Sequence, residues 1–159
     1  MEMKYRFGFD VLGLVLFLIV MIPTCVWIGF PAPDDVLRME SVTPVLDVIA
    51  SVFQVLSVAC LCFVINERRS KLSLSPLLFL TITCILTYYL GWVLYYCGIV
   101  SPWIILLLTV PPCLGLILFA ADRKNLPAVL FAAGFAVCHL MYAYGNFIMW
   151  NSRPRSLFL

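Results

Sequence analysis

The chain has 159 residues, of which 64% are hydrophobic and 11% are charged, and its formal net charge is +2. Soluble domains carry roughly a quarter charged residues, which they need because a domain of this size leaves about a third of its unfolded-chain surface in water. Composition therefore excludes a water-soluble fold and indicates the lipid bilayer as the surroundings of the chain. The small net charge and the scattered basic residues also exclude nucleic acid as a partner.

Five apolar segments are each long enough to cross a hydrocarbon core of about 30 Å, which takes around 20 helical residues. They cover residues 9–30, 44–65, 76–99, 102–121 and 127–150. Three of them begin with a hydroxyl residue followed by proline, the pattern of an N-cap and first helical position, at Thr43-Pro44, Ser75-Pro76 and Ser101-Pro102. The sequence predicts an all-α integral membrane bundle of five transmembrane helices in a single membrane domain. Because most connections are short, consecutive helices are expected to be antiparallel neighbours.

The basic residues near the helix ends predict the orientation. One side collects Lys4, Arg6, Arg68, Arg69, Lys71, Arg123 and Lys124, and the other collects only Arg38, Arg153 and Arg155. With an odd number of spans, the amino terminus is expected in the cytoplasm and the carboxyl terminus outside the cell membrane.

The connection at residues 31–43 is the most distinctive polar stretch. Asp34, Asp35 and Glu40 offer oxygen ligands that suit Ca²⁺ or Mg²⁺, or a cationic partner. The alternative is structural: Asp34 caps a short interfacial helix, Asp35 favours its positive end, and Arg38 pairs with a neighbouring carboxylate.

Polar residues in the second and fifth spans follow helical spacing. Asp47, Ser51 and Gln54 share one face of the second span, and His139, Tyr142 and Asn146 share one face of the fifth. These faces are expected to point into the bundle, because ionisable groups avoid lipid and often mark a ligand site or a proton path. The alternative is that they join helices by hydrogen bonds.

Pro111 and Pro112 lie in the middle of the fourth span. They remove two amide donors and free the carbonyls of Leu107 and Leu108, which predicts a kink. A mid-membrane break can present backbone oxygens to an ion or substrate, whereas proline kinks in membrane helices more often serve packing. In the third span, Gly91 is expected to permit the close approach of another helix.

Motifs of the common enzyme classes are missing. The chain has no GxSxG, no HExxH, no paired-glutamate intramembrane protease pattern and no phosphate loop. Its seven cysteines lie inside apolar runs without the spacing of metal ligands. An enzyme is therefore the minority interpretation, and neither a cofactor nor a metal is expected.

At Pro31-Ala32-Pro33-Asp34-Asp35-Val36-Leu37-Arg38, at Glu40-Ser41-Val42-Thr43-Pro44 and at Ala121-Asp122-Arg123-Lys124-Asn125, the chain resembles a set of small bacterial multi-pass membrane proteins that carry no assigned function. The likeness extends over most of the chain. It implies a bacterial cytoplasmic membrane and supplies no activity, substrate or catalytic residue.

Two hypotheses of function remain. The favoured one is an accessory or structural subunit of a membrane complex, suggested by the small residues Ala132, Ala133, Gly134 and Ala136, which suit helix packing. The alternative is a small oligomeric transporter or channel whose polar path uses Gln54, His139 and the Pro111-Pro112 kink. Either way, the expected partners are the lipid bilayer and either another membrane protein or further copies of this chain.

Overall fold

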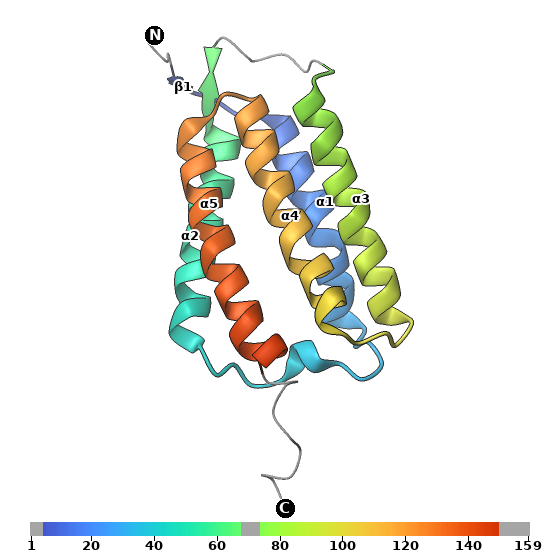
Figure 1. The fold of residues 1–159 in the computed structure, drawn as a ribbon. Coiled ribbons are helices and arrows are strands. Elements are labelled where there is room, and N and C mark those ends of the chain that lie inside the picture. Colours follow the sequence, from blue (N-terminus) through green and yellow to red (C-terminus); the bar gives the residue numbers. More distant parts are fainter. Residues whose placement is uncertain (1–4, 68–73, 150–159) are drawn as a thin grey trace, which may run out of the picture.

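A computed structural model describes residues 5–67 and 74–149 of the protein (Figure 1). Its five long helices are α1 (Val11–Gly29), α2 (Pro44–Phe63), α3 (Pro76–Tyr96), α4 (Pro102–Asp122) and α5 (Leu126–Ala143). Each is long and apolar enough to span a membrane, the fifth with its continuation to Ile148. The predicted all-α bundle of five transmembrane helices is therefore confirmed.

Four short elements complete the described chain. Strand β1 (Tyr5–Phe7) pairs antiparallel with β2 (Val64–Asn66), and Tyr5 lies opposite Asn66. A 3₁₀ turn, η1 (Val36–Arg38), lies in the first long connection, and a π-helical stretch, η3 (Tyr144–Ile148), continues α5. We call the end of the bundle that carries β1 and β2 the sheet end, and the end that carries the 30–43 connection the loop end.

Helix boundaries differ from the prediction where a backbone feature intervenes. The second span stops at residue 63 rather than 65 because residues 64–66 leave the helix to pair with β1. The third stops at Tyr96 rather than 99, two residues before Gly98, whose φ of +81° does not fit a right-handed helix. The predicted end of the fifth span, residue 150, lies outside the described residues, as do Lys4, Arg68, Arg69, Lys71, Arg153 and Arg155.

Side chains cap four of the five helices. Asp10, Ser75, Ser101 and Asn125 each accept a hydrogen bond from a backbone amide in the first turn of α1, α3, α4 and α5. Two of the three predicted hydroxyl caps are thus confirmed. Thr43 stands at the N-cap position of α2 without such a bond, and its Oγ1 instead accepts a hydrogen bond of 2.7 Å from Asn146.

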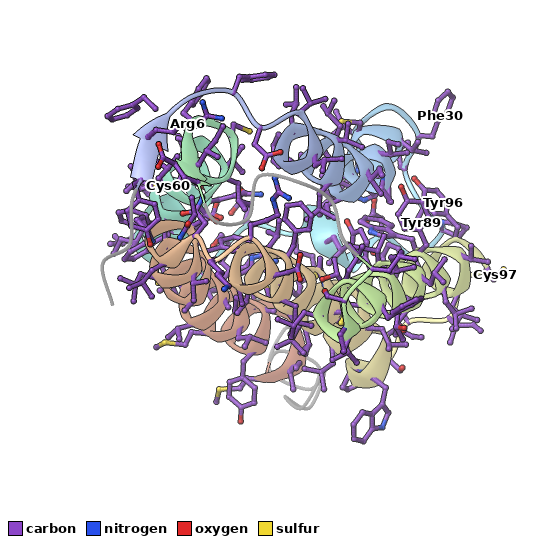
Figure 2. The ribbon with its side chains drawn as sticks, turned by 90° about the horizontal axis from the view of Figure 1, so that it is seen from above. Arg6, Phe30, Cys60, Tyr89, Tyr96 and Cys97 are labelled. Carbon is purple, nitrogen blue, oxygen red and sulfur yellow. The ribbon has the colours of Figure 1, made fainter. Side chains whose placement is uncertain are left out.

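The helices form a ring in the order α1, α2, α5, α4 and α3, with α3 closing on α1 (Figure 2). The pairs α2–α5, α5–α4 and α4–α3 pack most extensively, whereas α1 touches its neighbours more sparsely. The expectation that consecutive helices are neighbours fails for α2 and α3, because α5 and α4 stand between them. Large apolar side chains such as Val45, Leu86 and Leu130 are exposed on the outside of the ring, where lipid is their solvent.

Small residues bring the packed helices together. A Cβ placed on Gly91 of α3 would lie 3.0 Å from Cβ of Leu107 in α4, which confirms the predicted close approach. A Cβ on Gly134 of α5 would lie 2.8 Å from the ring of Phe53 in α2. Helix α4 continues as one helix through Pro111 and Pro112, so these prolines do not divide the span into two half-helices.

Candidate functional site

A cavity of about 360 Å³ lies inside the ring and is bordered by all five helices. It occupies the half of the bundle nearer the loop end. Its walls come from residues 20–27 of α1, 47–54 of α2, 88–92 of α3, 105–116 of α4 and 135–143 of α5, with Leu37 and Phe147 at the loop end. A volume of this size is within the range of ligand pockets, which runs from about 300 to 1,000 Å³.

Most of the predicted polar residues meet at this cavity. Asp47 and Gln54 of α2 line it, and so do His139 and Tyr142 of α5. The prediction that these two faces point inward is confirmed, and the ring order explains it because α2 and α5 are neighbours. Their meeting does not depend on a direct bond between the two helices, because neither Gln54 nor His139 makes a side-chain hydrogen bond to another described residue.

Asp47 provides the carboxylate of the cavity. It lies in the first turn of α2, where the positive end of the helix dipole favours a negative charge. It is exposed, and it is close enough to His139 and Tyr142 to interact with both electrostatically. The His139 ring is stacked on Tyr142, with centroids 6.4 Å apart and planes 3° apart, and on Phe135 at 4.9 Å. The α2–α5 wall therefore joins one carboxylate to a row of aromatic rings.

Aromatic side chains also form the opposite wall. Trp92 of α3 lies at the centre of this wall, 6.4 Å from the Trp27 ring, 6.3 Å from Tyr88 and 5.9 Å from Tyr95. Only 7% of Trp92 is exposed, and its indole Nε1 has no hydrogen-bond partner among the described residues. The Nε1 atom is itself shielded and lies beside Tyr88, so Trp92 contributes the aromatic ring rather than a free donor to the cavity wall.

Of the two mid-span prolines, Pro112 lines the cavity and is buried. The residue four positions before it, Leu108, lines the cavity as well. The next residue, Thr109, turns its hydroxyl to the Ile105 carbonyl at 2.7 Å. This part of α4 supplies a mainly apolar surface to the cavity.

Asn146, the last of the predicted intramembrane polar residues, does not line this cavity. Its amide donates hydrogen bonds of 2.7 Å to Thr43 Oγ1 and 2.9 Å to the Tyr142 carbonyl, and its oxygen accepts one of 2.7 Å from the Val42 amide. Asn146 therefore fastens the end of the fifth span to the 30–43 connection.

Asp35 in the same connection is held by three donors. One oxygen accepts a hydrogen bond of 2.7 Å from the Tyr95 hydroxyl, and the other accepts from Trp27 Nε1 at 2.7 Å and from Arg38 Nε at 3.0 Å. The guanidinium of Arg38 also lies 4.9 Å from the centre of the Trp27 ring. The predicted pairing of Arg38 with a neighbouring carboxylate is confirmed, and the cluster closes the cavity at the loop end, where Leu37 lines it.

The other two acidic residues of the connection stand apart from this cluster. Asp34 and Glu40 are exposed, and Asp34 has a left-handed φ of 49°. Asp35, rather than Asp34, is the residue at the N-cap of η1. Within residues 5–67 and 74–149, no group of three or more His, Cys, Asp or Glu is placed to hold a metal ion.

Tyrosines of α3 attach α1 to the other helices of the bundle. The Tyr89 hydroxyl donates to the Ile19 carbonyl at 2.7 Å, and the Tyr96 hydroxyl donates to the Phe30 carbonyl at 2.6 Å. Figure 2 shows Tyr89 and Tyr96 on the side of α3 that faces α1 and Phe30. Pro23 in α1 has no amide hydrogen and so leaves the Ile19 carbonyl without its helical donor. Tyr89 supplies the missing hydrogen bond.

A buried ion pair at the sheet end was missed by the sequence reasoning, which counted Arg123 only as a basic residue beside a span. Arg123 Nη2 lies 2.7 Å from Asp10 Oδ2, and the two side chains are 6% and 10% exposed. Asp10 also caps α1, and Arg123 is the C-cap of α4, so each charge lies at the helix end that favours it. An aspartate directly before an apolar run signals the cap, but nothing in the sequence signals a partner 113 positions away.

The residues next to Arg123 in the chain also make hydrogen bonds to other parts of the bundle. Buried Asp122 accepts a hydrogen bond from the Ser75 hydroxyl. The amide of Asn125 donates to the carbonyls of Cys60 and Val64, both at 2.8 Å. The connection between α4 and α5 therefore fixes α1, α2 and α3 at the sheet end.

Comparisons with protein families, with curated proteins and with solved structures found no match for this chain.

Proposed function

We propose that this protein binds a small amphipathic molecule in the cavity between its five helices. The observation that carries the proposal is the cavity itself, which combines apolar walls with a few polar groups that have no bonding partner among the described residues. Ligand pockets have this composition, because apolar walls supply affinity and isolated polar groups fix orientation. Asp47, Gln54 and His139 are the polar groups in question.

The packing supports binding in a pocket rather than an open channel. On the sheet-end side of the cavity the bundle is filled by buried residues, among them Leu61, Phe119 and Ala132, each at most 4% exposed. The Asp10–Arg123 pair lies beyond them. A molecule in the cavity would meet this packed half, so passage across the membrane would require the helices to separate there.

The small residues of α5 no longer favour an accessory subunit. Ala132 and Ala136 are buried inside the bundle, and Gly134 packs against Phe53 of α2. The face that suggested an external partner is thus occupied within this chain. Extraction of the tagged protein in mild detergent, followed by mass spectrometry of what travels with it, tests the point: a stoichiometric protein partner would favour the accessory role over the one proposed.

We also propose that the protein lies in a bacterial cell membrane with its amino terminus in the cytoplasm. Arg6 and Lys124 are at the sheet end together with the start of the described chain, and α5 ends at the loop end (Figure 1). Basic residues gather on the cytoplasmic side of membrane proteins. A reporter fused after residue 159 should be active only outside the cytoplasm, and activity inside it would contradict this orientation.

Melting measurements on the protein in lipid nanodiscs test the binding proposal. Three aromatic probes of similar size, phenethylammonium, phenylacetate and benzyl alcohol, differ in charge. A probe that binds the cavity at 100 times its dissociation constant adds about 2.7 kcal/mol to the stability of the folded state. At least one probe should raise the melting temperature of the wild type.

A matched pair of variants separates binding in the cavity from effects on the lipid. Ala143 is 3% exposed and lines the cavity, so Ala143→Phe fills it, whereas Val137 is 59% exposed on the outside. The stabilisation should disappear in Ala143→Phe and persist in Val137→Phe. The proposal is wrong if no probe distinguishes the wild type from Ala143→Phe.

A further inference from the structure

The formal charge on the cavity wall is of one sign. Asp47 carries the formal negative charge of the wall, and no lysine or arginine of the described chain lines it. The Asp47 carboxylate forms no ion pair and no side-chain hydrogen bond with another described residue. His139 is the titratable base that faces it, from the neighbouring helix α5. A carboxylate beside a mostly apolar cavity gains most from a cationic guest, and it repels an anionic one.

The rings of the cavity favour the same guest. Trp92 and Tyr88 lie on one side, and Phe135, His139 and Tyr142 form a stacked row on the other. Aromatic faces attract ammonium groups through the ring quadrupole, and the attraction grows when water is excluded. The rings also supply the apolar contact that the body of an amphipathic molecule needs.

Resting on the function proposed above, we infer that the ligand class of this cavity is an organic cation, an amine or quaternary ammonium on an apolar body. Asp47 provides the counter-charge, and the rings around Trp92 and His139 enclose the ammonium and its apolar part.

The entrance lies beside the first turns of α2. Asp47 and Ser51 both line the cavity and are both exposed, one turn apart on the same face of the helix. A thiol at position 51 therefore reports on what reaches the cavity past Asp47. Cys97, exposed and at the C-cap of α3, provides a reference thiol outside the cavity at the same end of the bundle.

The experiment compares two thiol reagents of similar size and opposite charge on Ser51→Cys in lipid nanodiscs. One is the trimethylammonium-ethyl methanethiosulfonate and the other is the sulfonatoethyl methanethiosulfonate. Peptide mass spectrometry follows residue 51 and Cys97 in the same sample, and each rate is divided by the rate of that reagent with free cysteine. The cation-to-anion ratio at residue 51 should exceed the ratio at Cys97 by about tenfold or more, because a cleft of one charge concentrates the opposite ion.

Asp47→Asn in the Ser51→Cys background should bring the two ratios together. Benzyltrimethylammonium, at increasing concentration, should slow labelling of residue 51 while benzenesulfonate does not. Equal ratios at residue 51 and Cys97, or a ratio that Asp47→Asn leaves unchanged, would overturn the cation class and leave the binding proposal intact. If neither reagent reaches residue 51 while both react with Cys97, the proposed function fails together with this inference. Gln54→Cys, deeper in the same wall, replaces Ser51→Cys should that variant fail to fold.

Discussion

Replacing Arg123 by methionine tests the contribution of the buried ion pair at the sheet end. The substitution keeps an unbranched apolar stem and leaves the Asp10 carboxylate, 10% exposed, without the guanidinium that lies 2.7 Å away. Breaking one partner of a buried pair costs about 3–5 kcal/mol, because an uncompensated charge remains in a poorly solvated place. For a chain of this size that corresponds to a fall in the melting temperature of roughly 10 °C.

A double-mutant cycle with Asp10→Asn isolates the pair from the other contacts of both residues. Asparagine retains an oxygen that can cap α1, where Asp10 now accepts a hydrogen bond of 3.0 Å from the Leu12 amide. The double variant carries neither charge of the pair, so it should be more stable than Arg123→Met alone by about 2 kcal/mol.

Buried cysteines supply the readout for this cycle. Cys62 and Cys113 are 4% and 2% exposed, so a fluorogenic maleimide reacts with them only as the bundle opens. Replacing the exposed Cys25 and Cys97 and the half-buried Cys60, Cys84 and Cys138 by serine in every variant removes the background signal. The reasoning is refuted if Arg123→Met melts within about 3 °C of its parent, or if the double variant is no more stable than the single one.

Three further variants test the attachment of α1 and of the loop end. Tyr89→Phe should lower stability by about 1 kcal/mol in the same melting assay, because the Ile19 carbonyl loses its hydrogen-bond donor. In chains that carry alanine instead of Pro23, the alanine amide replaces that donor, so the loss of stability should vanish. Gly13→Ala should lower stability by about 1–3 kcal/mol because a Cβ there would lie 2.7 Å from the Leu61 carbonyl oxygen; Gly29→Ala, with no atom within 4 Å, is its control, and equal effects of the two would contradict the packing. Asp35→Ala should lower stability by about 2–3 kcal/mol, since it leaves the Tyr95 and Trp27 donors without their acceptor, and a melting temperature equal to the wild type would rule out that role.

The five spans could be predicted because each carries its own signal. About 20 apolar residues in a row suffice to place a helix in lipid, and local signals such as Ser75-Pro76 mark where a helix begins. The misplaced ends have non-local or conformational causes: residues 64–66 leave α2 to pair with β1, nearly 60 positions earlier in the chain. No local pattern contains that pairing.

The candidate site was predictable in part. Helical spacing placed Asp47 and Gln54 on one face and His139 and Tyr142 on another, and the cost of polar groups in lipid turned both faces inward. Spacing alone did not separate Asn146 from this set, because the Thr43 and Val42 groups that bind it come from another part of the chain.

What the sequence determined by itself is the membrane as solvent, the five helices and the inward direction of their polar faces, because these follow from transfer free energies summed over single segments. Only the tertiary structure decided that α2 lies beside α5, that α1 is held by Tyr89 and by the Asp10–Arg123 pair, and that a cavity remains between the helices. The physical reason is that lipid and helix interiors are about equally apolar, so hydrophobicity does not choose neighbours. Close contacts of glycines and hydrogen bonds between residues far apart in the chain make that choice.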